Sequence, residues 1–435
     1  MDTEIGAGRR IVRRSAAGAP AVLVRPLGAS ERMYHRYQER HTLHHCIVAE
    51  LAGDLAPSAL EAGLLAVQHR HPLLTVHVED HPRTRLGFYR PAAVPPIPLT
   101  VISAGTGRGR TWRDVVAGEL TRPFDTARAP MIRAVLLRAG PATPAAIVLT
   151  CAQVIIDGVS AVYILRDLFA ALSGHRLSAR PVPPAQEGPI RRLRDAQPAA
   201  GGPAPFQPGV EPQWMRTPGP FRPFDHAVPS LSAVSFGVEL TRRLAGRARA
   251  EQTTVHSALV AAMTQVIMVP GTKNFVRMLS PINVRAQIGG GGDVGDYFTP
   301  ARTAFTRQGL TDLWDMARAV TGQLAGPRSV PGLLAGSTLL ERRMPVDVTG
   351  AEAEAFVVAG LSFEASASNL GVLDLGRPQA VRPAAIWGPA ALTQVAGELS
   401  AGICTFNGQL RMVCASHDPL PGYLDRVRDL LDGAC

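Results

Sequence analysis

Lysine is almost absent from this chain of 435 residues: Lys273 stands alone, and arginine carries nearly all of the positive charge. The formal net charge is +10. Arginine binds phosphate and carboxylate groups through a fixed fork of donors, so an acidic or phosphate-bearing partner fits this composition. The arginines are scattered, and no module of basic and aromatic residues is present. We therefore expect no nucleic-acid partner.

Cysteine and long apolar runs are also scarce. The five cysteines are unevenly spaced and form no C-x-x-C pair, so we expect reduced thiols and no metal site. No apolar run approaches the roughly 20 residues of a membrane-spanning helix, which excludes a membrane span. A weak apolar stretch ends at Val24 without a small-residue cleavage site. We therefore expect no secretory signal and a cytoplasmic location.

Hydrophobic residues make up 46% of the chain and charged residues only 18%, a balance typical of a packed globular protein. From about Gly174 to Pro229, proline, glycine, arginine and alanine dominate and hydrophobic periodicity is lost. This stretch predicts a linker or a long crossover. We expect an N-terminal extension over 1–29, an N-terminal subdomain over 30–175, a linker over 176–230 and a C-terminal subdomain over 231–435.

Apolar patterning predicts helices and strands in both halves. A helix is expected to open at Ser58, with Glu61 completing a capping box, and to stop at Pro72. Further helices are expected over Ser160–Leu172, Thr253–Met268 and Tyr423–Leu431. Strands are expected over Cys46–Leu51, Leu73–Val78, Met131–Arg138, Ala146–Cys151, Phe275–Val284, Leu361–Ala367 and Ile403–Cys414, the third and fourth as an antiparallel pair. The elements mix without a βαβ rhythm, which predicts an α+β fold.

The most informative segment is LTCAQVIIDGVSAVYILRDLFAAL, Leu149 to Leu172, in which a strand leads through Asp157-Gly158 into a helix. Four other segments accompany it in order: RHPLL from Arg70, RPFD from Arg122 with PMIR from Pro130, PINVR from Pro281 with GDYF from Gly295, and SNLG from Ser368. Together they resemble the condensation-domain superfamily. That superfamily includes condensation domains of nonribosomal peptide synthetases, chloramphenicol acetyltransferase and stand-alone polyketide-associated acyltransferases. The five segments span nearly the whole chain.

The resemblance implies two chloramphenicol-acetyltransferase-like subdomains that form a V-shaped pseudo-dimer with a tunnel at their interface. It implies a phosphopantetheine-linked or coenzyme A-linked substrate, delivered by an acyl or peptidyl carrier protein or as a coenzyme A thioester. It implies no metal and no tightly bound cofactor. The motif positions are Gly158, Ser160, Asn283, Ser368 and Asn369, and the family's structural ion pair falls on Asp157 and Arg285.

The sequence departs from the family at the signature H-H-x-x-x-D-G, where Ala152 and Gln153 occupy the two histidine positions. In the family the second histidine is the base or positioning group for acyl transfer, a task that suits imidazole because its pKa lies near neutrality. Gln153 cannot accept a proton at neutral pH. It can still donate and accept hydrogen bonds, so an orienting role is expected.

Three interpretations remain open. The protein acts on a thioester-bound acyl group in secondary-metabolite or complex-lipid biosynthesis, with Gln153 orienting the substrate for ester or amide formation. Alternatively, it cyclises a bound intermediate in the same tunnel. In the third interpretation it is inactive and binds a carrier protein or recruits a partner enzyme. The preserved tunnel motifs favour the first two, an acyltransferase or a cyclase.

Other residues are alternatives to the missing base. His44 and His45 precede the first expected strand, so one of them could face the tunnel, although exposed loop histidines are the commoner explanation. His256 lies on an apolar helix and is better explained as a core histidine bonded to backbone. Cys151 is better explained as a small buried hydrophobe than as a nucleophile. Ser160 is expected to cap the helix that follows it.

Overall fold

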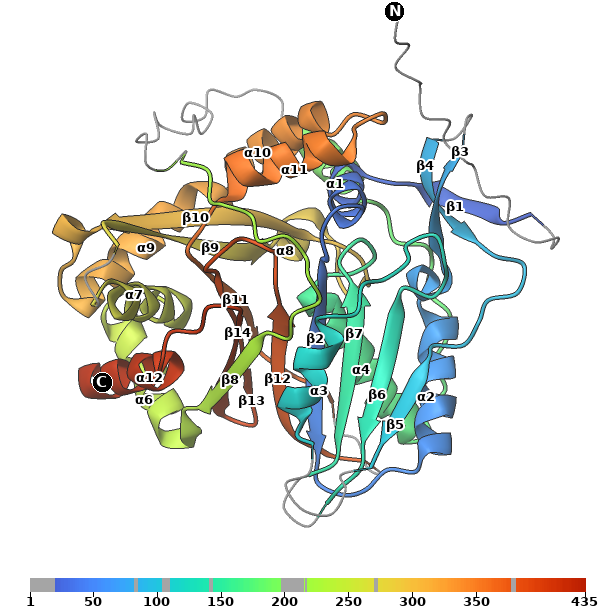
Figure 1. Ribbon diagram of the computed structural model, residues 1–435, viewed down its shortest axis with the longest axis horizontal. Helices are drawn as coiled ribbons and strands as arrows, with labels where there is room; N and C mark the ends of the chain where they lie inside the picture. The colour runs from blue at the N-terminus through green and yellow to red at the C-terminus, as the bar shows by residue number, and fades with distance from the viewer. Residues whose placement is uncertain are drawn as a thin grey trace, which may run out of the picture.

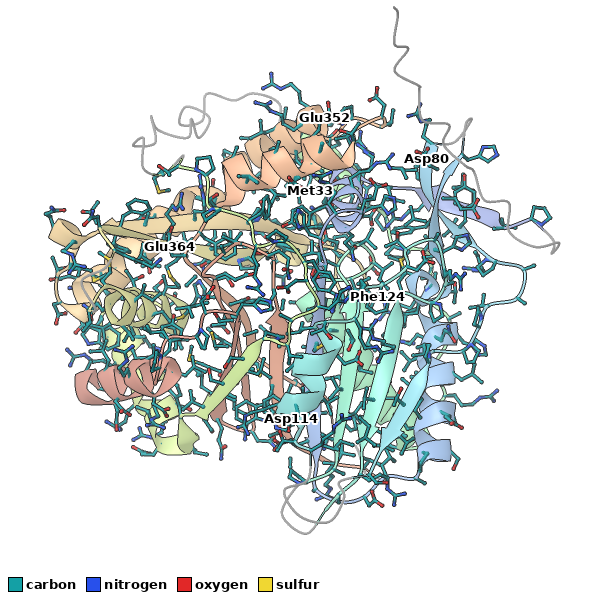
Figure 2. The ribbon with its side chains drawn as sticks, viewed as in Figure 1. Met33, Asp80, Asp114, Phe124, Glu352 and Glu364 are labelled. Atoms are coloured by element: carbon teal, nitrogen blue, oxygen red, sulfur yellow. The ribbon has the colours of Figure 1, made fainter. Side chains whose placement is uncertain are left out.

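The computed structural model describes residues 20–81, 85–103, 110–140, 144–196, 215, 217–269, 273–376 and 381–435. Over these residues the chain forms two mixed α+β halves that stand side by side (Figure 1). Side chains from both halves line the junction, among them Met33 (Figure 2). The expected α+β fold class is confirmed.

The first half contains the elements from β1 to α5. They are β1 (Val22–Pro26), α1 (Ala29–Gln38), β2 (His44–Leu51), α2 (Pro57–Arg70), η1 (Pro72–Thr75), β3 (His77–His81), β4 (Arg85–Arg90), β5 (Leu99–Ile102), α3 (Trp112–Glu119), β6 (Ile132–Leu137), β7 (Ala146–Ala152), α4 (Gly158–Leu172) and α5 (Glu187–Ala196). A five-stranded sheet has the order β12-β2-β7-β6-β5, and a small three-stranded sheet has the order β1-β4-β3.

The second half contains the elements from β8 to α12. They are β8 (Ser230–Ser235), α6 (Gly237–Ala250), α7 (Val255–Met268), β9 (Phe275–Asn283), α8 (Arg285–Ile288), β10 (Phe298–Thr306), η3 (Arg307–Gly309), α9 (Leu313–Arg328), α10 (Val330–Arg343), α11 (Gly350–Leu361), β11 (Ala365–Val372), β12 (Pro383–Ala391), β13 (Leu399–Phe406), β14 (Gln409–Ser416) and α12 (Tyr423–Ala434). Its six-stranded sheet has the order β10-β9-β11-β13-β14-β8.

The alternation of side chains along a strand gives β2 two apolar faces. Ile47 and Ala49 belong to the core under α2 and α4, whereas Cys46 and Val48 pack with α3 and with β14 of the second half. A strand buried on both faces reads as the continuous apolar run CIVAEL, which explains why it is visible in the sequence. The first sheet therefore lies in the middle of the molecule, with the second half against its other face.

Several expected elements are confirmed. β6 and β7 pair antiparallel, with Ala134 opposite Leu149. Helices α4, α7 and α12 and strand β9 lie within one to three residues of their expected bounds. Helix α7 is buried on nearly all sides because it packs between the second sheet and helices α6, α9 and α12. This burial accounts for its almost uniformly apolar sequence.

The expected boundaries between the parts of the chain need correction. Strand β1, inside the expected extension, pairs with β4, so regular structure begins before residue 30. Helix α5 lies inside the expected linker, where Pro189 and Ile190 are buried. Strand β12 of the second half completes the first sheet by pairing with β2, Trp387 opposite Val48. The second half therefore contributes a strand to the sheet of the first half, which a division at the proline-rich stretch does not anticipate.

Four local expectations were wrong. Helix α2 begins at Pro57 after Ala56 and has no capping box, because the methyl side chain of Ala56 at the N-cap position cannot accept a hydrogen bond. Pro72–Thr75 form a 3-10 turn before β3. Helix α11 runs to Leu361, and β11 starts only at Ala365. The expected strand Ile403–Cys414 is the β13–β14 hairpin, turned at Asn407-Gly408.

Candidate functional site

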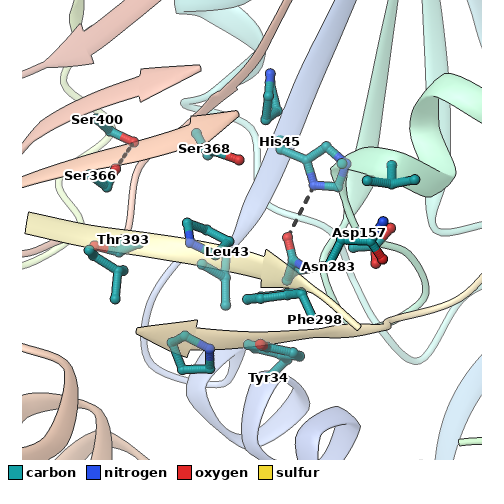
Figure 3. A pocket seen from close by; sticks show the side chains of 18 of the residues that line it. Tyr34, Leu43, His45, Asp157, Asn283, Phe298, Ser366, Ser368, Thr393 and Ser400 are labelled. Atoms are coloured by element: carbon teal, nitrogen blue, oxygen red, sulfur yellow. Dashed lines mark hydrogen bonds between the residues drawn. The ribbon is translucent and has the colours of Figure 1, made fainter. Parts of the chain in front are cut away.

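A cavity lies at the junction of the two halves. Its walls come from α1, β2, the end of β7, the start of α4, β9, β10, α11, β11, β12 and β13 (Figure 3). It contains about 1230 Å³ not filled by protein atoms, including the part open to solvent. The lining residues are Met33, Tyr34, Tyr37, Leu43, His45, Gln153, Asp157, Gly158, Val159, Leu279, Pro281, Asn283, Phe298, Pro300, Val357, Phe363, Ser366, Ser368, Asn369, Leu370, Pro389, Ala391, Thr393 and Ser400.

Two of the expected site residues meet in this cavity. Gln153 follows the last residue of β7, and its backbone N–H donates to the carbonyl of Leu43 at 3.2 Å. Strand β2 lies beside β7 with His45 opposite Cys151, which brings the imidazole of His45 next to the Gln153 side chain. His45 Nδ1 and Gln153 Oε1 are 3.2 Å apart and hydrogen-bonded (Figure 3).

The environment of His45 keeps its imidazole neutral. The residue is only 2% exposed, and burial lowers its pKa to about 4, although the nearby charge of Asp157 and the bond to Gln153 oppose the shift. Nε2 is buried and has no hydrogen-bond partner. The expectation of exposed loop histidines was wrong, because His44 and His45 are the first two residues of β2 and both are buried.

His44, His256 and Cys151 do not line the cavity. His44 Nε2 is 2.9 Å from the carbonyl oxygen of Glu119, on the other face of the strand from His45. His256 Nε2 is 3.0 Å from Ser280 Oγ, so its partner is a side chain and not the expected backbone group. Cys151 is fully buried, and burial raises the pKa of its thiol. Of the four alternatives to Gln153, only His45 therefore faces the cavity.

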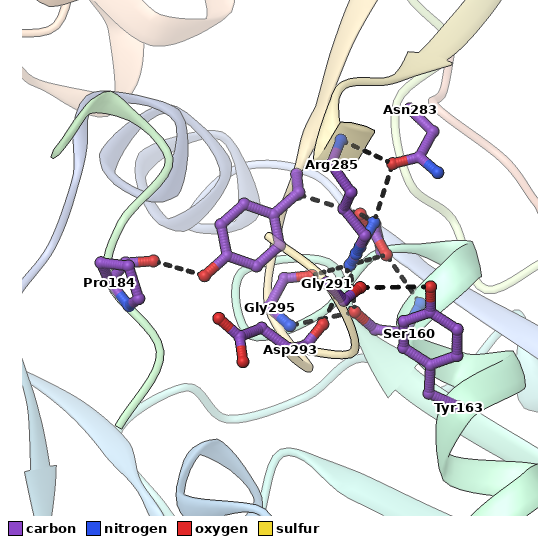
Figure 4. Close-up of polar contacts among 10 residues, drawn as sticks. Ser160, Tyr163, Pro184, Asn283, Arg285, Gly291, Asp293 and Gly295 are labelled. Atoms are coloured by element: carbon purple, nitrogen blue, oxygen red, sulfur yellow. Dashed lines mark hydrogen bonds and ion pairs between the residues drawn. The ribbon is translucent and has the colours of Figure 1, made fainter. Parts of the chain in front are cut away.

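Asp157 and Arg285 form the expected ion pair between the halves. Arg285 donates to both carboxylate oxygens of Asp157, at 2.8 and 3.0 Å (Figure 4). The carboxylate also accepts from the backbone N–H groups of Ser160, at 2.8 Å, and Tyr297, at 2.9 Å. Asp157 is thus the N-cap of α4 as well as the partner of Arg285, and each residue is 4% exposed. Four donors therefore hold this carboxylate in place.

Ser160 belongs to the same network and does not cap α4. Its hydroxyl accepts from Arg285 at 2.7 Å and from the Gly295 backbone N–H at 2.9 Å, and donates to the Gly295 carbonyl at 2.7 Å. Asn283 Oδ1 accepts from the Arg285 backbone N–H at 3.1 Å. This network fixes the GDYF segment against the start of α4, directly beside the cavity wall formed by Asp157 and Gly158.

The cavity wall is mostly apolar but contains one strip of polar side chains. Ser366 and Ser400, on neighbouring parallel strands, are hydrogen-bonded at 3.1 Å (Figure 3). The motif residues Ser368 and Asn369 continue along β11, and Thr393 lies two residues beyond the end of β12. The opposite wall is aromatic, with Tyr34 of α1 stacked on Phe298 of β10 at 6.1 Å between ring centroids.

Sequence reasoning missed Tyr34, Ser366, Thr393 and Ser400. Thr393 is held by Glu398, whose carboxylate accepts from its backbone N–H and hydroxyl, each at 2.9 Å. Burial raises the pKa of Glu398 to about 7, and these hydrogen bonds oppose the shift. None of these residues stands in a local motif with chemical meaning. Phe298 alone carried a signal, as the last residue of GDYF.

No family model and no curated protein matches the chain. Solved structures do. Polyketide synthase associated protein 5 from Mycobacterium tuberculosis superposes with a TM-score of 0.66 and 14% identity, covering 95% of this chain and 98% of that chain. The condensation domain from Monacolin K polyketide synthase superposes with a TM-score of 0.63 and 14% identity, covering 95% of this chain and 97% of that one. This chain has the condensation-domain fold.

The same fold is found in a domain that is named for a different reaction. The epimerization domain from the third module of tyrocidine synthetase B superposes with a TM-score of 0.59 and 12% identity, over 96% of this chain and 97% of that chain. The expected pseudo-dimer architecture is therefore confirmed over almost the whole chain. Among the described residues, no helix is long and apolar enough to cross a membrane, and no histidine, cysteine and carboxylate side chains gather into a metal-binding group.

Proposed function

We propose that this condensation-fold protein binds a pantetheine-linked acyl thioester in the cavity and transfers the acyl group to an amine or hydroxyl. The observation that carries the proposal is the position of the cavity. It lies at the junction of the halves and is bordered by Gln153 and Asp157, which stand in the family's signature segment. The pathway we propose is the biosynthesis of a secondary metabolite or complex lipid.

The walls of the cavity suit two chemically different parts of such a substrate. Met33, Leu43, Phe298, Val357 and Phe363 form apolar surface that favours an acyl chain. Ser366, Ser368, Thr393 and Ser400 form the polar strip, which offers donors and acceptors to the amides of a pantetheine arm.

The reaction balances without a cofactor. The nucleophile attacks the thioester carbonyl, the carbon–sulfur bond breaks, and a carbon–nitrogen or carbon–oxygen bond forms. The proton lost by the nucleophile leaves with the pantetheine sulfur as the free thiol. The protein supplies binding and orientation, which lower the barrier by holding the reacting atoms in attack geometry.

A cavity-filling variant tests the proposal. Ala391 lines the cavity, so Ala391→Trp should block thioester binding. Ala250 lies exposed at the end of α6, which makes Ala250→Trp the matched control. Intact-protein mass spectrometry of acyl-loaded carrier proteins, with an amine or alcohol acceptor present, would show product with the control and not with Ala391→Trp. Product formed equally by both variants would place the reaction outside this cavity. If the unsubstituted protein binds the acyl-loaded carrier protein but forms no product, the result supports an inactive carrier-binding protein.

A further inference from the structure

The hydrogen bond between His45 and Gln153 determines which way the Gln153 amide faces. A neutral imidazole carries one N–H and one bare nitrogen. His45 Nε2 is buried and has no partner, and a buried unpaired N–H is rarer in proteins than a buried unpaired acceptor. The proton therefore resides on Nδ1, which donates to Gln153 Oε1 at 3.2 Å.

This arrangement uses the amide oxygen of Gln153 and leaves its nitrogen free. Gln153 is half-buried and lines the cavity. Within the described part of the chain, no group accepts a hydrogen bond from Gln153 Nε2, and His45 is the only side chain bonded to its amide. The amide therefore presents two N–H donors where relatives present the base of the signature.

We propose that the Gln153 side chain is a hydrogen-bond donor to the carbonyl oxygen of the bound thioester, and that His45 is the positioning residue that fixes this orientation. The inference rests on the proposed function. As the nucleophile attacks, the carbonyl oxygen gains negative charge, and a donor fixed in position stabilises that charge. Gln153 thus acts on the thioester carbonyl, whereas the histidine at this position in the family acts on the attacking amine or alcohol.

The same geometry argues against His45 as a replacement base. Its Nδ1 proton is engaged with Gln153, and its bare Nε2 is buried and inaccessible. A nucleophile would need to reach Nε2 to lose its proton there. Without a base, the site favours acceptors that react as neutral amines, whose proton passes to the departing thiolate.

The test uses octanoyl-coenzyme A labelled with ¹³C at the carbonyl, and the infrared frequency of that carbonyl in the complex. In the unsubstituted protein, a hydrogen bond should lower the carbonyl frequency relative to free ligand. Gln153→Glu keeps the size but replaces the N–H donors by acceptors, so the shift should disappear and transfer to hydroxylamine should fall roughly 10- to 1000-fold. His45→Phe should weaken the shift by freeing the amide. Gln265→Glu, on α7 and away from the cavity, is the control for an amide-to-carboxylate change.

The outcomes separate the two proposals. Binding by all variants with an unchanged carbonyl frequency overturns the donor role and leaves the thioester site intact. No binding by the unsubstituted protein overturns the thioester site and with it the donor role. If His45→Phe melts far below the parent protein, Gln153→Glu and Gln153→Leu still decide, because both leave β2 unchanged and both remove the donors.

Discussion

At the scale of single residues, the protonation state of His45 decides whether the site can act through a general base or only through a hydrogen-bond donor. Burial lowers the pKa of His45 to about 4, while Asp157 and Gln153 oppose the shift. Its imidazole should therefore stay neutral from pH 8 down to about 5. Histidine-selective ¹⁵N NMR should show no His45 titration near pH 6.5, and the transfer rate should have no limb there. A titration of His45 between pH 6 and 7 would contradict this assignment and favour a base.

Asp296 carries a second testable consequence of burial. The residue is 3% exposed, and burial raises its pKa well above the usual range, with the charges of Asp157, Glu31 and Glu187 acting in the same direction. The unfolded chain releases this proton near pH 4 and the folded chain holds it, so rising pH removes stability. Between these two pKa values, each unit of rising pH lowers the free energy of unfolding by about 1.4 kcal/mol through this group.

Asp296→Asn should therefore raise the free energy of unfolding, and the gain should grow with pH above about 4. Urea unfolding at several pH values measures this difference. Asp425→Asn, on the exposed surface of α12, is the matched control and should show no growing gain. A gain that shrinks with rising pH would show that Asp296 is ionised in the folded protein.

At the scale of secondary-structure elements, one ion pair holds together the junction of β7, α4, β9 and α8. Asp157→Ala removes the N-cap of α4 and leaves the buried Arg285 charge without its partner. Breaking a buried pair in this way costs about 3–5 kcal/mol. Urea unfolding should show this loss, whereas Glu239→Ala, which breaks an exposed pair with Arg242, should change little. Normal stability of Asp157→Ala with lost activity would instead give the carboxylate a chemical role.

Periodicity predicted those elements whose burial is uniform along the chain. Strand β2 and helix α7 are surrounded by apolar neighbours, so their sequences show continuous apolar runs. The β13–β14 hairpin was missed because both strands are rich in buried apolar residues and only a two-residue turn separates them. Its signal was Asn407-Gly408, where both residues have positive φ, 51° and 74°, and which favours a tight turn.

The candidate site could be predicted only where it coincides with a motif. Gln153, Asp157 and Arg285 stand in signature segments, and their positions follow from those segments. His45 reaches Gln153 through the pairing of β2 with β7, and Ser400 reaches Ser366 through parallel pairing of β13 with β11. Contacts between strands far apart in sequence leave no local pattern. The sequence therefore indicated where the site lies but not the partner that orients Gln153.

At the scale of the whole molecule, the two halves are held together where β12 and β13 lie in close contact. A Cβ at Gly402 of β13 would lie 1.9 Å from the carbonyl oxygen of Pro389 in β12. Gly402→Ala should therefore force the two strands apart and cost about 1–3 kcal/mol or more. Gly433→Ala, in α12 with no atom near the added methyl, is the matched control and should stabilise slightly. Equal melting temperatures for both variants would contradict the tight passage.

The net charge of +10 bears on the partner of the whole molecule. An acidic carrier protein should be attracted by exposed arginines, and salt screens such attraction beyond about 8 Å at physiological ionic strength. Binding of an acyl-loaded carrier protein should therefore weaken as salt rises, chiefly through a slower association rate. The same acyl group on free pantetheine lacks phosphate and carrier charge, so its binding to the cavity should be nearly independent of salt. Carrier binding as insensitive to salt as that of the pantetheine thioester would show that the exposed arginines do not recruit the carrier, and that the cavity alone selects the ligand.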